Sequence, residues 1–225
     1  MKDRLIIAID GPAGSGKSTV ARQVARRMGI LYVDTGAMYR AITLKALRSH
    51  TSLRDEKALS ELVAETNIDL KIDGDFGLSV YLDGEDVTEE IRRQYVTNNV
   101  KHLACLPAVR ERMVVLQRHA SRSGRAVLEG RDIGTVVFPD ADFKVFLDAS
   151  EEERVNRRYK ELRLKGYDVN RDEIKRDVDS RDTSDKTREV APLKKAVDAV
   201  YIDTTGLTIE EVTDKIIKGL ESLKR

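Results

Sequence analysis

The 225-residue chain offers little sulfur or imidazole chemistry, because it contains one cysteine and three histidines. A single cysteine, Cys105, cannot form an internal disulfide, and its position in an apolar segment predicts a buried, unreactive thiol. The histidines are scattered without the spacing of zinc ligands, which disfavours a zinc site. Any metal is therefore expected to be a hard cation bound through oxygen atoms.

Long apolar runs and a charge imbalance are also absent. No stretch approaches the roughly 20 apolar residues of a membrane-spanning helix, and an apolar run beginning at Leu5 leaves no room for a secretion signal before it. The 40 Lys and Arg residues nearly balance 39 Asp and Glu residues, which does not favour wholesale binding to nucleic acid. We expect a cytoplasmic protein, monomeric by default, whose partners are small molecules rather than a membrane or a nucleic acid.

Residues 11–18 match the phosphate-binding loop pattern G-x-x-x-x-G-K-[ST] and directly follow an apolar run at residues 5–9. Glycines let successive backbone N–H groups turn toward an anion, and a helix starting near Lys17 adds its positive end. In this motif Lys17 contacts the transferring phosphoryl group and the Ser18 hydroxyl coordinates Mg²⁺. The residues predicted to bind the nucleotide are Gly11, Pro12, Ala13, Gly14, Ser15, Gly16, Lys17, Ser18 and Thr19.

Short apolar runs alternate with segments of helical periodicity, which predicts an α/β protein with helices flanking a five-stranded parallel sheet. The expected strands cover residues 5–9, 30–33, 126–128, 143–147 and 199–202, and the expected helices 17–28, 37–49, 107–122, 150–165 and 208–224. Residues 68–72 and 78–82 instead alternate apolar and polar side chains around a turn at residues 73–77. This pattern predicts a small antiparallel β insertion over about residues 67–100.

Charged and hydroxyl side chains follow the second and third expected strands. Thr35 and Arg40 come after the second strand, and Glu129, Arg131 and Asp132 after the third. Because ligands bind at the carboxyl ends of parallel strands, two arginine forks at this edge indicate a phosphorylated second substrate. The alternative interpretation is that these are ordinary helix-capping and surface ion-pair residues.

A helix expected after residue 148 carries Arg154, Arg157 and Arg158 on one face. Such arginines are suited to neutralising charge in a phosphoryl-transfer transition state, although they also fit a solvated face paired with glutamates. The charged segment 180–188 is either surface or a grip for a sugar hydroxyl and a phosphate. No nucleophile–base pair is evident, and a phosphate acceptor needs none because its oxygen is already anionic.

Residues 9–17, 34–40, 130–139 and 191–193 resemble the corresponding motifs of the bacterial cytidylate kinases, and the resemblance extends over nearly the whole chain. It implies transfer of the γ-phosphoryl group of ATP to CMP or dCMP with Mg²⁺. It also implies a P-loop kinase fold with a core at about 1–66, 101–149 and 190–225. The nucleoside-monophosphate-binding insertion would then cover about 67–100, and a helical lid about 150–189.

The same resemblance implies roles for individual residues. Asp132 is expected to accept a hydrogen bond from the cytosine amino group, and Glu129 to lie near hydrated Mg²⁺. Lys101 stands where some relatives carry a small hydroxyl residue that contacts the base. The full expected substrate set is Thr35, Arg40, Lys101, Arg110, Arg131, Asp132, Arg181, Asp185 and Arg188, and the expected catalytic residues are Lys17, Arg131, Arg154, Arg157 and Arg158.

Two alternative functions remain open at the level of sequence. One is a kinase for another small acceptor, such as UMP or a sugar acid. The other is a noncatalytic or hydrolytic nucleotide-dependent switch, which the phosphate-binding loop alone does not exclude.

Overall fold

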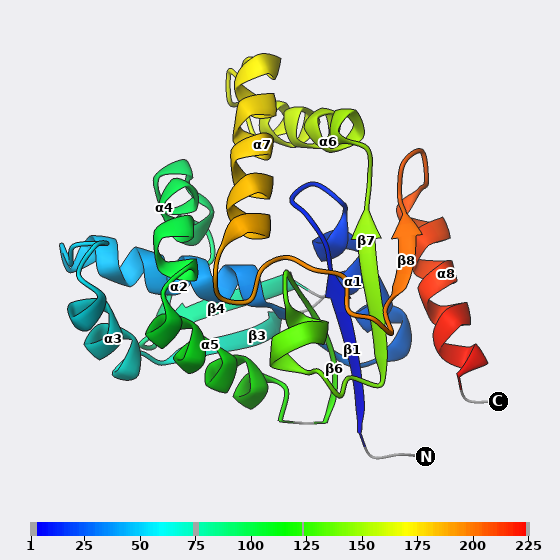
Figure 1. Cartoon of the computed structure of the whole chain (residues 1–225), viewed down its shortest axis with the longest axis horizontal. Helices are drawn as coiled ribbons and strands as arrows, with labels where there is room; N and C mark the ends of the chain where they lie inside the picture. Colours follow the sequence, from blue (N-terminus) through cyan, green and yellow to red (C-terminus); the bar gives the residue numbers. More distant parts are fainter. Residues whose placement is uncertain (1–3, 74–76, 123, 224–225) are drawn as a thin grey trace.

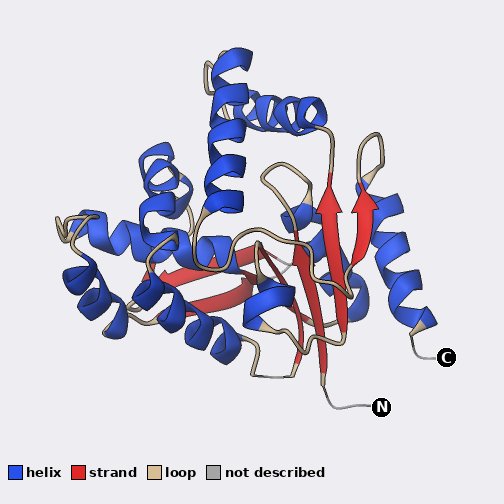
Figure 2. Cartoon of the chain, in the orientation of Figure 1, coloured by secondary structure: helices blue, strands red, loops and turns tan. Residues whose placement is uncertain are grey.

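The computed structural model describes residues 4–73, 77–122 and 124–223, and a parallel sheet of five strands lies at its centre (Figures 1 and 2). The strand order is β2-β6-β1-β7-β8, so the strand that precedes the phosphate-binding loop is central. Every residue of β1 is buried, as expected for a strand covered on both faces. The strands are β1 (Leu5–Asp10), β2 (Leu31–Asp34), β6 (Arg125–Gly130), β7 (Phe143–Asp148) and β8 (Val200–Asp203).

The helices predicted around this sheet are present. Helix α1 packs against β6 and α8, and α2 packs against β6 and also against the antiparallel sheet. Helix α2 begins two residues earlier than predicted because the Asp34 carboxylate accepts the Ala37 N–H at 2.7 Å and caps the helix. The bounds are α1 (Lys17–Met28), α2 (Thr35–Arg48), α5 (Pro107–Ala120), α6 (Glu151–Leu164) and α8 (Ile209–Ser222).

The predicted hairpin is also present, as β3 (Ile68–Asp73) paired antiparallel with β4 (Gly77–Leu82), followed by the short strand β5 (Glu85–Asp86). Residues 74–76 of its predicted turn lie outside the described residues. The β structure ends at Asp86, short of the predicted limit, because the chain then turns into a 3₁₀ turn and helix α4 (Gln94–Ala104). Val96 and Leu103 are buried on one face of α4 at helical spacing, a periodicity that the prediction missed.

Helices α6 and α7 (Arg171–Thr187) pack against each other beyond the carboxyl ends of β1 and β7, above the phosphate-binding loop in Figure 1. A small apolar cluster of Val155, Ile174 and Val178 holds the pair together, separate from the main core. Helix α7 lies within the helical lid implied by the family resemblance, but it was not among the helices expected from periodicity because its charged sequence has few apolar positions. Helix α3 (Glu56–Ala64) was also missed.

Cys105 is exposed, so the prediction of a buried thiol was wrong. Leu103 occupies the buried position at this end of α4, and Cys105 follows the last helical residue with its Sγ 3.3 Å from the carbonyl oxygen of His102. Within the described ranges, no helix combines the length and apolar character needed to cross a membrane.

One irregular element follows β6. Residues Ile133–Val137 form a single turn of π-helix, η2, which begins directly after Asp132. Its position at the carboxyl end of β6 places it beside the phosphate-binding loop, since β6 and β1 are neighbouring strands.

Candidate active site

The phosphate-binding loop connects β1 to α1 and takes the backbone conformation that its glycines permit. Gly14 and Gly16 have φ angles of 77° and 88°, in the region that other residues rarely adopt. Helix α1 begins without a side-chain cap and without an acidic residue in its first turn. Its first N–H groups and its positive end therefore face the loop, where an anion satisfies both.

The nine residues predicted to bind the nucleotide differ in exposure. Gly11, Pro12, Ser15 and Lys17 are buried, Ala13, Gly14 and Gly16 are half-buried, and Ser18 and Thr19 are exposed.

Lys17 is buried in the loop, and its ammonium donates to the carbonyl oxygen of Pro12 at 2.7 Å. Burial, followed by the charge of Arg131, lowers the pKa of Lys17 to about 7, and Glu129 opposes the shift. An ammonium held in this environment gains strongly from an added anion. The loop is therefore electrostatically prepared for phosphate.

Ser18 and Glu129 bring oxygen atoms together at the start of α1. The Ser18 hydroxyl donates to Glu129 Oε1 at 2.5 Å, and the Tyr32 hydroxyl lies 3.3 Å from the same oxygen. Burial and the neighbouring Asp34 raise the pKa of Glu129, so an added cation would relieve an unfavourable charge. Carboxylate and hydroxyl oxygens are the ligands that Mg²⁺ prefers, so this pair fits the metal.

Thr35 and Arg40 lie in the first two turns of α2, which directly follows β2. The buried Thr35 hydroxyl donates to the carbonyl oxygen of Glu129 at 2.6 Å. A Cβ on Gly130 would clash with this hydroxyl, so the glycine permits the contact. Arg40 is half-buried and pairs with Asp34 at 3.3 Å, and its Nε has no partner among the described residues.

Asp132 lies between two buried arginines that come from distant parts of the chain. Arg110 of α5 donates from Nη2 to Asp132 Oδ2, and Arg188, just after α7, has its Nη2 3.7 Å from Asp132 Oδ1. The side chains of Arg110, Asp132 and Arg188 are 4%, 8% and 7% exposed, respectively. Burial raises the pKa of Asp132, while Arg110 and Arg188 oppose the rise.

Arg131 and Asp185 form a second pair in the same region, with Arg131 Nε 2.7 Å from Asp185 Oδ2. Arg181 pairs with Asp177 at 2.9 Å. Burial lowers the pKa of Arg181 against the effect of Asp177, and Arg158 and Arg131 lower it further. Arg131 therefore acts as a neighbouring like charge on both Lys17 and Arg181, and Arg158 acts in the same way on Arg181. Such a concentration of cations is costly unless an anion binds among them.

The three α6 arginines predicted to be catalytic do not share one role in the structure. Arg154 is buried, donates to the loop carbonyl of Ala13 at 3.1 Å, and pairs with Asp182 of α7 at 2.7 Å. Arg157 donates to the carbonyl and hydroxyl of Thr204 at 2.7 and 2.9 Å. These two arginines tie the loop and neighbouring segments together.

Arg158, the third of these arginines, has donor capacity left over. It pairs with Glu161 at 2.9 Å, and its buried Nε has no partner among the described residues. Lys101, the one predicted substrate residue not yet described, is exposed in the final turn of α4.

Two residues that contact this network were not predicted. The Tyr39 ring lies beneath the guanidinium of Arg110, 5.9 Å from it, and Asp182 anchors Arg154. Tyr39 lies in the recognised segment 34–40, so its position was an available signal. Asp182 lies in the charged segment 180–188, but its burial was not foreseen because a carboxylate in a charged helix normally faces water.

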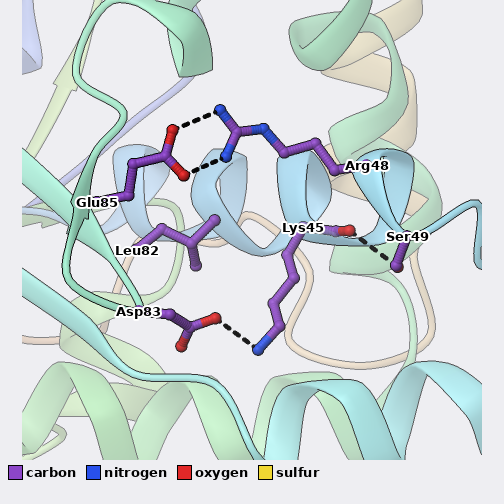
Figure 3. A pocket seen from close by; sticks show the side chains of 6 residues that line it. All are labelled: Lys45, Arg48, Ser49, Leu82, Asp83 and Glu85. Atoms are coloured by element: carbon purple, nitrogen blue, oxygen red, sulfur yellow. Dashed lines mark hydrogen bonds and ion pairs between the residues drawn. The ribbon is translucent and has the colours of Figure 1, made fainter.

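A cleft of about 350 Å³ lies elsewhere, between α2 and the antiparallel sheet (Figure 3). Its charged groups already have partners: Lys45 pairs with Asp83 at 2.7 Å, and Arg48 with Glu85 at 2.7 Å. The cleft is therefore a joint between two elements, whereas the candidate site is the network around the phosphate-binding loop.

The chain is similar to known proteins over nearly its whole length. The sequence profile of the family described as "Cytidylate kinase" matches residues 7–222. A cytidylate kinase of Bacillus pumilus is 52% identical over the full length of both chains. One of Pelotomaculum thermopropionicum is 51% identical over 219 residues, 97% of each chain.

A crystal structure of an uncharacterised protein from Eubacterium ventriosum superimposes with a TM-score of 0.53 at 15% identity, covering 97% of this chain and 99% of its own. This likeness shows the fold alone, whereas the matches at half identity over the whole length show the family. The chain belongs to the cytidylate kinase family.

Proposed function

We propose that this protein transfers the γ-phosphoryl group of ATP to CMP and dCMP, forming CDP and dCDP. The observation that carries the proposal is the buried Asp132 carboxylate, held by Arg110 and Arg188 at the sheet edge that also carries Lys17. A phosphate loop alone fits any nucleotide-binding protein. Beside the loop, the buried Asp132 carboxylate can accept a hydrogen bond from a base, and the surrounding arginines can bind an anion. Together they supply a site for a second, anionic substrate that carries a base.

On the donor side, residues 11–19 bind the ATP phosphates through backbone N–H groups, Lys17 and the start of α1. Ser18 and Glu129 hold Mg²⁺, which supplies charge neutralisation on the phosphate oxygens when bound. Arg154 and Arg157 keep the loop in its conformation through the carbonyl of Ala13 and through Thr204.

On the acceptor side, Asp132 accepts a hydrogen bond from the cytosine amino group. Uracil presents a carbonyl at that position, and two facing acceptors would be left unpaired, which discriminates against UMP. Arg110 and Arg188 orient the carboxylate, and Asp185 and Arg181 contact the sugar side. Thr35, Arg40 and Arg131 hold the acceptor phosphate, and the role proposed for Lys101 is a contact to the base.

In the transfer, an oxygen of the CMP phosphate attacks the γ-phosphorus while the bond to the β–γ bridging oxygen breaks, releasing ADP. No general base is required because the attacking oxygen is already anionic. Lys17, Arg131 and Arg158 neutralise the charge that develops on the transferring group. Positioning of the two substrates supplies the remainder of the rate enhancement.

The arrangement of elements suggests a division of labour. The parallel sheet and its helices form the core, residues 67–100 the acceptor-binding insertion, and residues 150–189 a lid. Closure of the lid over the loop excludes water and suppresses ATP hydrolysis. We propose that the protein acts as a cytoplasmic monomer in pyrimidine nucleotide metabolism.

A coupled ADP-release assay with ATP and Mg²⁺ tests the proposal, with CMP, dCMP, UMP, a sugar acid or no acceptor. Strong turnover with CMP and dCMP and weak turnover with UMP is the expected result. Turnover with UMP or the sugar acid as the best acceptor would favour the alternative kinase, and hydrolysis without any acceptor would favour a nucleotide-dependent switch.

A further inference from the structure

Asp10 is a buried carboxylate for which the proposed chemistry has no use. It is the last residue of β1, immediately before the phosphate-binding loop, and is 4% exposed. Its two oxygens accept the backbone N–H groups of Ile133 and Gly134, each at 2.8 Å. Both partners lie more than 120 residues further along the chain.

These two N–H groups belong to the first turn of the π-helix η2, where a helix lacks internal acceptors. The residue at the usual capping position, Asp132, makes no side-chain cap. Asp10 therefore caps η2 from a different strand. Gly134 contributes by having no side chain, since a Cβ there would lie 3.1 Å from Lys144 Cδ and 3.4 Å from Asp10 Oδ2.

The start of η2 decides where the acceptor-binding groups lie. Asp132 directly precedes the turn and reaches Arg110 and Arg188, and Arg131, one residue earlier, reaches Asp185. A shift of the first turn would move both side chains together. The far end of η2 is held separately, because Arg118 of α5 donates to the carbonyls of Val137 and Val136 at 2.8 and 3.2 Å.

Burial of the Asp10 carboxylate disfavours its charged form. Burial raises the pKa of Asp10 to about 6, the N–H groups of Gly134 and Ile133 oppose the rise, and the nearby charge of Asp132 adds to it. A second carboxylate beside a buried one is unfavourable for folding. Its retention is better explained by the position it fixes than by stability.

We propose that Asp10 is a positioning residue that fixes the base-reading Asp132 and the phosphate-contacting Arg131 relative to the donor loop. The inference rests on the proposed function of Asp132. Strand β1, which ends at the phosphate-binding loop, thereby sets the geometry of the acceptor site through the two hydrogen bonds that Asp10 accepts.

The test is Asp10→Asn, compared with Asp142→Asn as a matched control. Asp142 also accepts a backbone N–H from a distant segment, that of Ile6 at 2.9 Å, but at the opposite end of β1. In Asp10→Asn, an amide NH₂ replaces one acceptor and faces an N–H donor. We expect kcat/KM for CMP to fall about 100-fold, as for a displacement of about 1 Å.

The readout specific to positioning is the ratio of kcat/KM for CMP to that for UMP. We expect it to fall at least about 10-fold in Asp10→Asn while the KM for ATP changes by less than about threefold. In Asp142→Asn both quantities should stay at the wild-type values. An unchanged ratio in a folded Asp10→Asn protein overturns the inference. So does a change confined to the KM for ATP, which would mean that the substitution acts on the donor site through Lys17.

A second variant covers failure of Asp10→Asn to fold. Arg118→Gln releases the far end of η2 without leaving a buried charge, since Arg118 is exposed. It should lower the ratio in the same direction by a smaller factor, and an unchanged ratio would count against the inference. Wild-type turnover with CMP reports separately on the proposed function.

Discussion

Arg110 and Asp132 form a buried ion pair between α5 and the end of β6, with side chains only 4% and 8% exposed. Each charge depends on the other, because a buried ion without its partner is strongly destabilising. The pair fixes the direction of the Asp132 carboxylate, and Arg110 opposes the rise that burial causes in its pKa. A fixed direction is what the proposed role of Asp132 in reading the base requires.

Asp132→Asn should abolish the preference for CMP. The amide keeps the side-chain volume but can present either a donor or an acceptor, so uracil is no longer rejected. We expect the ratio of kcat/KM for CMP and UMP to fall about 100-fold, measured by coupled ADP release. Asp140→Asn, which changes an exposed carboxylate paired with Arg4, should leave the ratio unaltered. Retention of CMP preference in Asp132→Asn would contradict base readout by this residue.

Lys17→Met should lower kcat about 1,000-fold while stabilising the nucleotide-free protein at neutral pH. The folded-state pKa of Lys17, about 7, lies below its ordinary value of 10.5. The unfolded state therefore binds more protons between these values, and the cost of the buried ammonium is complete below about pH 7 and relieved as the pH rises.

The stability difference between Lys17→Met and the wild type should accordingly shrink between pH 7 and 10.5. Urea unfolding curves across this range measure it. A difference independent of pH would mean that burial of the charge does not destabilise the loop.

Arg154→Met should act chiefly on stability. The substitution leaves Asp182 buried without its partner, so the free energy of unfolding should fall by about 3–5 kcal/mol. Adding Asp182→Asn should restore part of that loss, because the stranded charge is removed. Denaturant unfolding of the single and double variants measures the coupling, and additive losses would show that the pair is not an energetic unit.

Arg158→Ala should show the opposite behaviour. Its partner Glu161 is 46% exposed, so the lost ion pair costs at most about 1 kcal/mol. We expect kcat to fall about 100-fold through lost charge neutralisation, with little change in KM for either nucleotide. Steady-state kinetics at saturating ATP and CMP measure this, and an unaltered kcat would remove Arg158 from the proposed mechanism.

Arg48→Ala tests the joint shown in Figure 3. Arg48 pairs with Glu85 and Glu90, but these side chains are 37%, 60% and 29% exposed. Solvent and salt screen such pairs, so the loss of stability should be about 1 kcal/mol or less and should disappear in about 1 M salt. A loss above about 3 kcal/mol would show that the network acts as a cooperative anchor of the antiparallel sheet.

The family resemblance and the parallel sheet were confirmed because their signals are local. The loop pattern at residues 11–18 specifies its own backbone through glycines and the start of a helix. Each buried strand is a short apolar run. Periodicity did not indicate helix α7, which is mostly charged and was covered only by the helical lid that the resemblance implied. The π-helix η2 escaped prediction because it depends on groups outside itself.

The roles expected for individual site residues remain predictions, although the structure brings most of these residues to one edge of the sheet. The sequence by itself determined the fold class, the loop and the family, because each strand and each motif on which they rest is a short local pattern. Only the tertiary structure decided that Arg154 ties α6 to the loop, that Asp132 lies between Arg110 and Arg188, and that Asp10 caps η2. The physical reason is that the partner of each buried charge comes from a distant element, and packing of the elements selects it.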